Sequence, residues 1–261
     1  VDFTRGFLLL EDFGDKLVQS VLTDITVKYR YQQAEATLLS IQQLPVNPHI
    51  FKAYDTELLS EELDLFQHWF VKELLGIRID SAAQLMIEKL YSDLISSALE
   101  QPRVIVHRDY HSRNLMILND DSIGVIDFQD AVYGPITYDL VSLLRDCYVR
   151  WPVELVQERT LNYKKKLEQL GLVDGVSDQE FLRWFDLMGL QRHIKVMGIF
   201  SRLALRDHKV DYLGDLSLVI TYSLAIANLY PETREFAYWF KHEITPYVLK
   251  QGWYKEWSGQ Q

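Results

Sequence analysis

Three short apolar runs in the middle of the chain constrain the fold most strongly. They are VIVH (104–107), LMIL (115–118) and IGVID (123–127), and each has the length and the branched apolar side chains of a buried strand. NDDS between the second and third runs is typical of a hairpin turn. The polar stretch RDYHSRN (108–114) joins the first two runs, so we expect a loop held on a rigid support, where chemistry is usually placed.

The rest of the chain has mainly helical periodicity. We expect helices near residues 24–44, 60–76, 80–100, 138–150, 153–170, 178–206, 212–229 and 232–250. Ser60 has the character of an N-cap, and Gly76 that of a C-terminal stop. GFLLLEDFG (6–14) indicates a strand that leads into a turn. The sequence therefore predicts an α+β, mainly helical fold with a small β-hairpin region.

Composition and charge exclude several classes of protein. The chain has 261 residues, 48% hydrophobic, which is enough for one large domain or two small ones. A formal net charge of −10 argues against a general affinity for nucleic acid or for an anionic membrane. We see no apolar run near the roughly 20 residues of a membrane span, and no signal peptide, so we expect a cytoplasmic protein. Cys147, the single cysteine, has apolar neighbours that favour burial.

An acid, an amide and a second acid follow the predicted strand ends. Asp109 and Asn114 lie in the loop, and Asp127 ends the third apolar run. If the third run pairs with the second, Asn114 and Asp127 offer two oxygen ligands that face a common point, as suits Mg²⁺. Asp109 is then left to orient or deprotonate an attacking hydroxyl. The pattern H-R-D-x4-N followed by D-F indicates phosphoryl transfer.

These motifs resemble those of the kinase-like phosphotransferases, which include aminoglycoside phosphotransferases and choline kinases. DFQD (127–130) stands in place of DFG, and YGPITYDLVSLLRD (133–146) follows without an activation segment. With QRHIKVMGIFSRLALRD (191–207), these stretches are similar to the bacterial N-acetylmuramate/N-acetylglucosamine anomeric kinases of cell-wall recycling. The resemblance implies the C-terminal lobe of a protein-kinase-like (aminoglycoside phosphotransferase) fold, ATP and Mg²⁺ as cofactors and an amino sugar as acceptor.

The resemblance also implies roles for single residues. Asp109 is implied as the catalytic base, and Asn114 and Asp127 as Mg²⁺ ligands. Asp139 resembles the aspartate that braces the catalytic loop from behind, and His107 is expected to support the loop from beneath. In the hinge, LLLEDFG, the backbone around Glu11, Asp12 and Phe13 is implied to meet the adenine of ATP.

The position of the hinge predicts a missing N-terminal lobe. We expect residues 1–14 to be the hinge strand of that lobe and residues 15–261 to be the helical lobe with the catalytic and metal loops. A chain without a phosphate-covering loop and its lysine is expected to be inactive alone, because phosphate positioning is most of the catalysis in this class. Loss of the lobe would uncover apolar surface around Phe7, Leu9 and Phe13, which would favour self-association.

The acceptor-binding residues are left as a set of candidates. They are His111, Arg113, Asp130 and Arg145, with His193, Arg202 and Arg206 added if the later helices form the floor of the site. A guanidinium at Arg113 would match the carboxylate of N-acetylmuramate in two parallel hydrogen bonds, or would instead bridge nearby acids at the surface.

Three functions remain open on this reasoning. The first is a sugar 1-kinase, and the second is an aminoglycoside or choline-type kinase. An acidic cluster in the acceptor pocket would favour the second, and arginines would favour the first. The third is a non-catalytic, one-lobed binding module, for which the only support is the absence of the first lobe.

Overall fold

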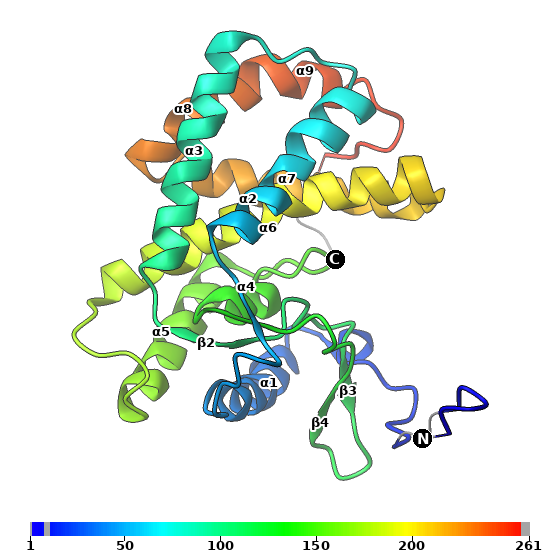
Figure 1. The fold of residues 1–261 in the computed structure, drawn as a ribbon, viewed down its shortest axis with the longest axis vertical. Coiled ribbons are helices and arrows are strands. Elements are labelled where there is room, and N and C mark those ends of the chain that lie inside the picture. Colours follow the sequence, from blue (N-terminus) through cyan, green and yellow to red (C-terminus); the bar gives the residue numbers. More distant parts are fainter. Residues whose placement is uncertain (1, 8–10, 257–261) are drawn as a thin grey trace.

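A computed structural model describes residues 2–7 and 11–256 of the chain. The upper part of Figure 1 is helical, and the lower part holds two small sheets and the remaining helices. The long helix α6 (Asp178–Asp207) crosses the molecule between the two parts and packs against helices of both. The prediction of a mainly helical α+β fold with small sheets is confirmed.

The predicted hairpin is present. Its strands β3 (Leu115–Ile117) and β4 (Ile123–Val125) are antiparallel, with Met116 opposite Gly124. The first apolar run forms β2 (Arg103–Val106), which pairs not with the hairpin but with β5 (Val132–Pro135). A very short strand, β1 (Lys52–Ala53), completes that second sheet in parallel with β5.

The segment before the first helix is fastened to the hairpin by its backbone. Val18 N–H donates to Leu115 O at 2.8 Å, and Ile117 N–H donates to Lys16 O at 2.8 Å. Phe13 packs across the hairpin, because a Cβ on Gly124 would lie 2.9 Å from the Phe13 ring. A glycine is therefore needed in β4 for Phe13 to lie this close.

The first half of the described chain contains three α-helices and one π-helix besides its strands. Their bounds are α1 (Val27–Gln42), α2 (Thr56–Leu65), the π-helix η2 (Phe66–Leu74) and α3 (Ser81–Leu99), with a short 3₁₀ turn η1 (Gln19–Val21) before them. The N-cap expected at Ser60 is wrong: Asp55 caps α2 by accepting from Leu58 N–H at 3.1 Å. Gly76 ends the helix with φ +67°, as predicted.

The second half is built around α6. The other helices are α4 (Tyr138–Leu144), α5 (Val153–Gln169), α7 (Leu216–Ala227), α8 (Arg234–Trp239) and α9 (Thr245–Val248). Shorter turns are η3 (Val210–Asp215), η4 (Pro231–Thr233) and the π-helical η5 (Phe240–Ile244). The helix expected over 232–250 is therefore broken into several pieces, and the one expected over 138–150 ends at Leu144.

The stretch Val210–Ala227 bears on the expectation that no run could span a membrane. Within the described residues it is one helical stretch that meets the length and hydropathy of a span, with a mean hydropathy of 1.3 over 18 residues. Half of it is buried inside the protein, where α7 packs on α6. The cytoplasmic location stays a prediction.

The expected strand over residues 6–14 is only partly described. Residues 8–10, with Leu9, lie outside the described part, and residues 11–14 belong to no strand. The nearest pairing is a single bridge between Asp2 and Phe7. Phe7 is 65% exposed, whereas Phe13 is half-buried against the hairpin.

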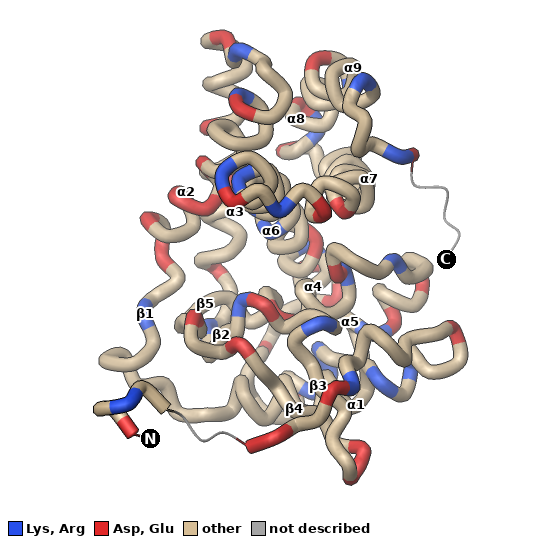
Figure 2. Tube along the Cα trace, turned by 90° about the vertical axis from the view of Figure 1, so that its right-hand side faces the viewer, with Lys and Arg blue, Asp and Glu red and all other residues tan. Residues whose placement is uncertain are grey.

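Acidic and basic positions are interspersed in both parts of the molecule in Figure 2. The net negative charge of the chain is therefore spread over many elements, so it does not define a site. The arrangement of charge that matters for function has to be sought in the interior of the described structure.

A tight crossing of α6 over the end of α2 gives a test of the fold. A Cβ on Gly198 would lie 2.4 Å from the main-chain carbon of Leu65, which leaves no room for a side chain. We expect Gly198→Ala to lower the free energy of unfolding by about 1–2 kcal/mol, because overpacking outweighs the gain in helix propensity. Urea denaturation measures the change.

The matched control is Gly189→Ala on the same helix. There the added methyl meets the flexible end of Arg145 at 3.2 Å rather than backbone. Equal stability of the two variants would show that the α6–α2 crossing is not as tight as described.

Candidate active site

The loop that carries Asp109 is held from behind by one carboxylate. Asp139, in the first turn of α4, accepts from His107 N–H at 2.6 Å and from Arg108 N–H at 3.0 Å. Asp139 is fully buried, and burial raises its pKa to about 7 against the two N–H donors, which favour the ionised form. This geometry supports the bracing role predicted for Asp139.

Arg108 has a backbone conformation that is rare for a residue with a side chain. Its φ is +75°, and its guanidinium forms an ion pair with Glu62 from α2. Glu62 also pairs with Lys195 at 2.8 Å and accepts from the Tyr54 hydroxyl. One buried carboxylate therefore connects the loop that carries Asp109 to α2 and α6.

Asn114 joins the loop to the hairpin. Its side-chain amide donates to the main-chain oxygen of Asp109 at 3.0 Å, and its own main-chain oxygen accepts from Ile126 N–H at 3.1 Å. The first bond uses the Nδ2 donor and leaves Oδ1 as the acceptor atom of the side chain. The second bond places Asn114 beside the end of β4.

Asp127 follows β4 at the same end of the hairpin. Its φ is +67°, a conformation that a non-glycine residue adopts mainly at special positions, and its exposed carboxylate accepts from Gln129 at 2.7 Å. One carboxylate and one amide oxygen fit Mg²⁺, which takes few protein ligands and completes its shell with water and phosphate oxygens. Among the described residues, no group of three or more His, Cys, Asp or Glu side chains could hold a metal ion.

The ring of His107 lies near both Asp109 and Asp127. Its ring Nε2 is 3.0 Å from Ile126 O, and its Nδ1 accepts from Asp109 N–H at 3.3 Å. Burial lowers the pKa of His107, whereas the carboxylates of Asp109 and Asp127 oppose that shift because both lie near the ring. These contacts support the prediction that His107 is a structural support, and they bring Asp109, Asn114 and Asp127 to one region.

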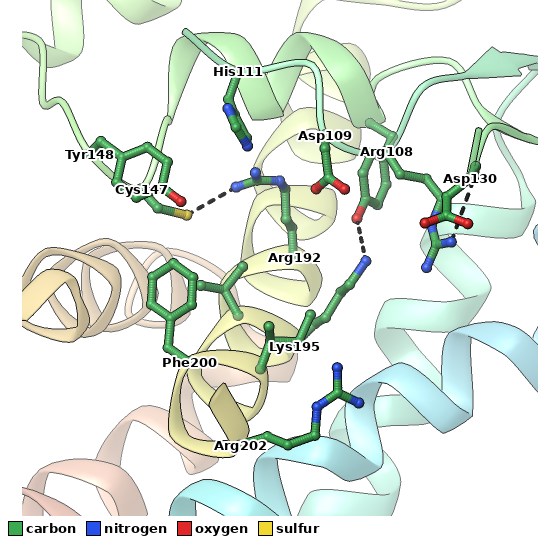
Figure 3. Close-up of a pocket in the computed structure, with 13 residues that line it drawn as sticks. Arg108, Asp109, His111, Asp130, Cys147, Tyr148, Arg192, Lys195, Phe200 and Arg202 are labelled. Carbon is green, nitrogen blue, oxygen red and sulfur yellow. Dashed lines mark hydrogen bonds between the residues drawn. The ribbon is translucent and has the colours of Figure 1, made fainter. Parts of the chain in front are cut away.

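The Asp109 carboxylate faces a cavity of about 270 Å³ (Figure 3). Burial favours the protonated form of Asp109, but the positive charges of Lys195 and Arg192 outweigh it and hold the pKa of the carboxyl below its usual value. An ionised carboxylate at this position can accept a hydrogen bond, or a proton, from a hydroxyl in the cavity.

Helix α6 forms the opposite wall of this cavity. Arg192, Lys195 and Arg202 project from it, and Figure 3 shows Arg192 and Lys195 pointing toward Asp109. Arg192 and Lys195 were not among the residues predicted from the sequence, although they lie in the stretch 191–207 that carried part of the resemblance. Cys147, buried as expected, accepts from Arg192 at 3.2 Å.

Two of the predicted acceptor residues line the cavity, and two do not. His111 and Asp130 are in its lining. Arg113 instead stacks on the Tyr148 ring, 3.4 Å from its centroid, donates to Gln19 at 3.0 Å and lines a neighbouring cavity of about 980 Å³. Arg145 is buried in an ion pair with Asp186, so its position is that of a structural residue.

The remaining candidates divide in the same way. Arg202 lines the cavity, at the end away from Asp109. His193 is buried, stacked on Tyr222, with Nε2 3.1 Å from Arg145 O. Arg206 is at the surface, where it pairs with Asp207 at 2.7 Å. Neither His193 nor Arg206 belongs to the lining of the cavity.

Of the predicted nucleotide-contacting residues, Phe13 lies against the hairpin. Glu11 and Asp12 have exposed side chains, and Asp12 accepts from Gly14 N–H at 2.8 Å. Phe13 packs on the hairpin that carries Asp127 at its end. A role of these residues in binding adenine stays a prediction.

A family model described as the phosphotransferase enzyme family matches residues 5–172, which include the loop, the hairpin and Asp139. The chain belongs to this family. An N-acetylmuramate/N-acetylglucosamine kinase of Pseudomonas aeruginosa is 40% identical over 90% of this chain and 69% of the relative. The corresponding kinase of Neisseria meningitidis serogroup B is 36% identical over 88% of this chain and 70% of the relative. The expectation of a small-molecule kinase of the phosphotransferase family is confirmed.

Solved structures with the same fold are more distant in sequence. A Plasmodium vivax ethanolamine kinase superposes with a TM-score of 0.59 at 14% identity, over 86% of this chain and 66% of that one. A gentamicin complex of APH(2")-IIa superposes with a TM-score of 0.54 at 13% identity, over 82% and 70%. The chain spans about two thirds of the length of these proteins. The protein-kinase-like fold is therefore confirmed.

The charge around Asp109 predicts a shift in pH dependence. Lys195 is the strongest of the cations that lower the pKa of Asp109, so Lys195→Met should raise that pKa. Because a protonated Asp109 cannot act as a base, the acid limb of kcat/KM should move to higher pH. A pH profile of kcat/KM measures this shift.

Lys195→Arg keeps the positive charge and is the control. Its acid limb should stay with that of the unaltered enzyme. An acid limb for Lys195→Met that coincides with both would mean that Lys195 does not set the protonation of Asp109.

Proposed function

We propose that this chain is the acceptor- and metal-binding lobe of an ATP-dependent kinase that phosphorylates the anomeric hydroxyl of N-acetylmuramate or N-acetylglucosamine. One observation carries the proposal: the Asp109 carboxylate faces a cavity walled by cations, on a loop that also bears Asn114 and is bonded to the strand before Asp127. The names of the relatives support the choice of amino sugar.

In this proposal Asp109 is the base. The acceptor hydroxyl occupies the cavity, and Asp109 accepts its proton as the new oxygen–phosphorus bond develops, while the bond between the γ-phosphorus and the bridging oxygen breaks and ADP leaves. The nearby cations keep the carboxylate ionised and ready to accept. An anomeric hydroxyl is more acidic than an ordinary alcohol, which lowers the demand on a base of low pKa.

Asn114 and Asp127 would hold Mg²⁺, which when bound with ATP would neutralise charge on the phosphates. The surface beside them is suited to being covered. Phe128 is 68% exposed and Ile126 is 37% exposed, although both are large apolar residues. We propose that the nucleotide and a second, nucleotide-covering lobe reach this face, with Glu11 to Phe13 as the hinge. Self-association through Phe7 stays a prediction.

The composition of the cavity disfavours a cationic acceptor. Four cations line it, namely Arg108, Arg192, Lys195 and Arg202, against the two carboxylates of Asp109 and Asp130. An aminoglycoside or choline would bring further positive charge into a cavity that is already basic. A neutral or anionic sugar is therefore the better fit. The non-catalytic module remains the third candidate, and measured turnover of any of these acceptors would exclude it.

Removal of the base tests the mechanism. In the full-length kinase, Asp109→Asn should lower kcat by about 10²-fold or more, because an amide cannot accept the proton. ATP affinity should change little, since the metal ligands remain. A steady-state assay with a nucleotide-binding titration separates the two effects, and an Asp109→Asn enzyme of normal kcat would remove Asp109 from the catalytic role.

The acceptor is tested by an assay of ATP consumption with four compounds. We expect the full-length kinase to turn over N-acetylmuramate and N-acetylglucosamine, and to turn over choline and kanamycin at least about tenfold less well in kcat/KM. A preference for choline or kanamycin would favour the aminoglycoside or choline-type kinase. No turnover with any of the four would favour the binding module. The chain of 261 residues, assayed alongside, tests its predicted inactivity alone.

A further inference from the structure

We propose that Arg202 binds a carboxylate of the acceptor and thereby makes the enzyme prefer an acid-bearing amino sugar to a neutral one. This inference rests on the proposed function, which supplies the two sugars that are compared. N-acetylmuramate carries a lactyl ether with a carboxylate, and N-acetylglucosamine carries a hydroxyl at the same carbon. A residue that recognises the carboxylate should therefore distinguish the two.

The cations of the cavity are not equally available to a ligand. Arg108 and Lys195 both pair with the buried Glu62, which satisfies much of their charge. Lys195 also donates to the Tyr138 hydroxyl at 3.1 Å. These two cations are therefore committed to the network that holds the loop, α2 and α6 together.

Arg192 lies at the end of the cavity near the reacting group. Its charge raises the acidity of Asp109, and in the described structure its guanidinium donates to a sulfur, Cys147 Sγ, which is a weak acceptor. A ligand group beside Arg192 would also be beside Asp109. Arg192 is thus placed to act on the acceptor hydroxyl or on the transferred phosphate, rather than on a distant substituent.

Arg202 is the cation that remains. Within the described residues it forms no ion pair or hydrogen bond with another side chain, which distinguishes it from Arg108, and its Nε, like that of Arg108, is buried without a partner. Asp207, near enough for Arg202 to contribute to its lowered pKa, already accepts from Arg206 with both carboxylate oxygens. A buried donor without an acceptor is unfavourable, which indicates that a ligand supplies the acceptor.

The position of Arg202 fits a substituent far from the reacting hydroxyl. Ten residues of helix separate Arg192 from Arg202, which corresponds to about 15 Å along α6. Figure 3 shows the Arg202 side chain entering the cavity from the end opposite Asp109. A sugar with its anomeric hydroxyl at Asp109 would extend toward this guanidinium.

The chemistry of the contact favours a carboxylate. A guanidinium presents parallel N–H donors that match the two oxygens of a carboxylate, whereas an ammonium acts as a point charge. Half-burial of Arg202 reduces the screening that weakens such pairs at a fully exposed site. Arg113, the residue first considered for this role, lines the neighbouring cavity instead.

The experiment compares kcat/KM for the two sugars in the full-length kinase. Arg202→Met keeps an unbranched apolar chain in place of the arginine stem and removes the charge and the N–H donors. We expect it to lower kcat/KM for N-acetylmuramate about 10- to 100-fold, the range for loss of hydrogen bonds to a charged group, and to leave N-acetylglucosamine within about twofold. Arg202→Lys keeps the charge but not the paired donors, so its effect on N-acetylmuramate should be intermediate.

Arg206→Met is the matched control, because Arg206 lies one turn further along α6, at the surface and paired with Asp207. It should change neither sugar. An equal loss for both sugars in both Arg202 variants, or no loss for either, would overturn the inference while leaving the proposed function intact. An unaltered kinase that phosphorylates neither sugar would overturn the proposed function and the inference together.

Discussion

The site depends on the two hydrogen bonds that the Asp139 carboxylate accepts from consecutive main-chain N–H groups. They fix His107 and Arg108 from behind, and Arg108 is held with φ +75°, a conformation that costs about 1–3 kcal/mol for a residue with a side chain. The strained turn is what carries the chain from β2 into the loop and directs Asp109 at the cavity. Because Asp139 belongs to α4, which packs on α6, the same interaction links the position of Asp109 to the opposite wall of the cavity.

The site is divided between two supports with different chemistry. The hairpin side has Asn114 and Asp127, the proposed Mg²⁺ ligands, and an exposed apolar surface at Ile126 and Phe128, where the nucleotide is proposed to bind. The α6 side offers positive charge to an acceptor. Glu62 connects the two, because it pairs with Arg108 of the loop and with Lys195 of α6. Some charged side chains of the site therefore pair with one another, as Glu62 does with Arg108 and Lys195, and others face the cavity.

The sequence allowed the catalytic segment to be predicted because its residues are close in the chain. The features that identify it are local: a fixed offset from Asp109 to Asn114, then a hairpin that ends at Asp127. Strands β3 and β4 pair as expected, and the Asn114 side chain donates to Asp109 O. Asp139 was found by resemblance to a family motif that lies a short distance downstream. By contrast, β1 and β5 were not predicted, since β1 has only two residues and β5 contains a glycine and a proline.

The residues of the acceptor side could not be sorted from the sequence. Arg113 was considered for the carboxylate of N-acetylmuramate because a guanidinium matches a carboxylate in two parallel hydrogen bonds, yet its side chain lies on the Tyr148 ring. Arg145 was also a candidate for binding the acceptor, but it is buried in an ion pair with Asp186. In the sequence, Arg192 and Lys195 are indistinguishable from other charged residues of a long helix. Only the packing of α6 opposite the loop shows that they face Asp109.

The sequence by itself determined the class of chemistry, because an acid, an amide and a second acid at fixed local spacing require only one loop and one hairpin. Tertiary structure alone decided which cations face that chemistry. The reason is physical: the interaction of a cationic side chain weakens with distance, and whether such a side chain meets Asp109, Glu62 or solvent depends on how α2, α4 and α6 pack.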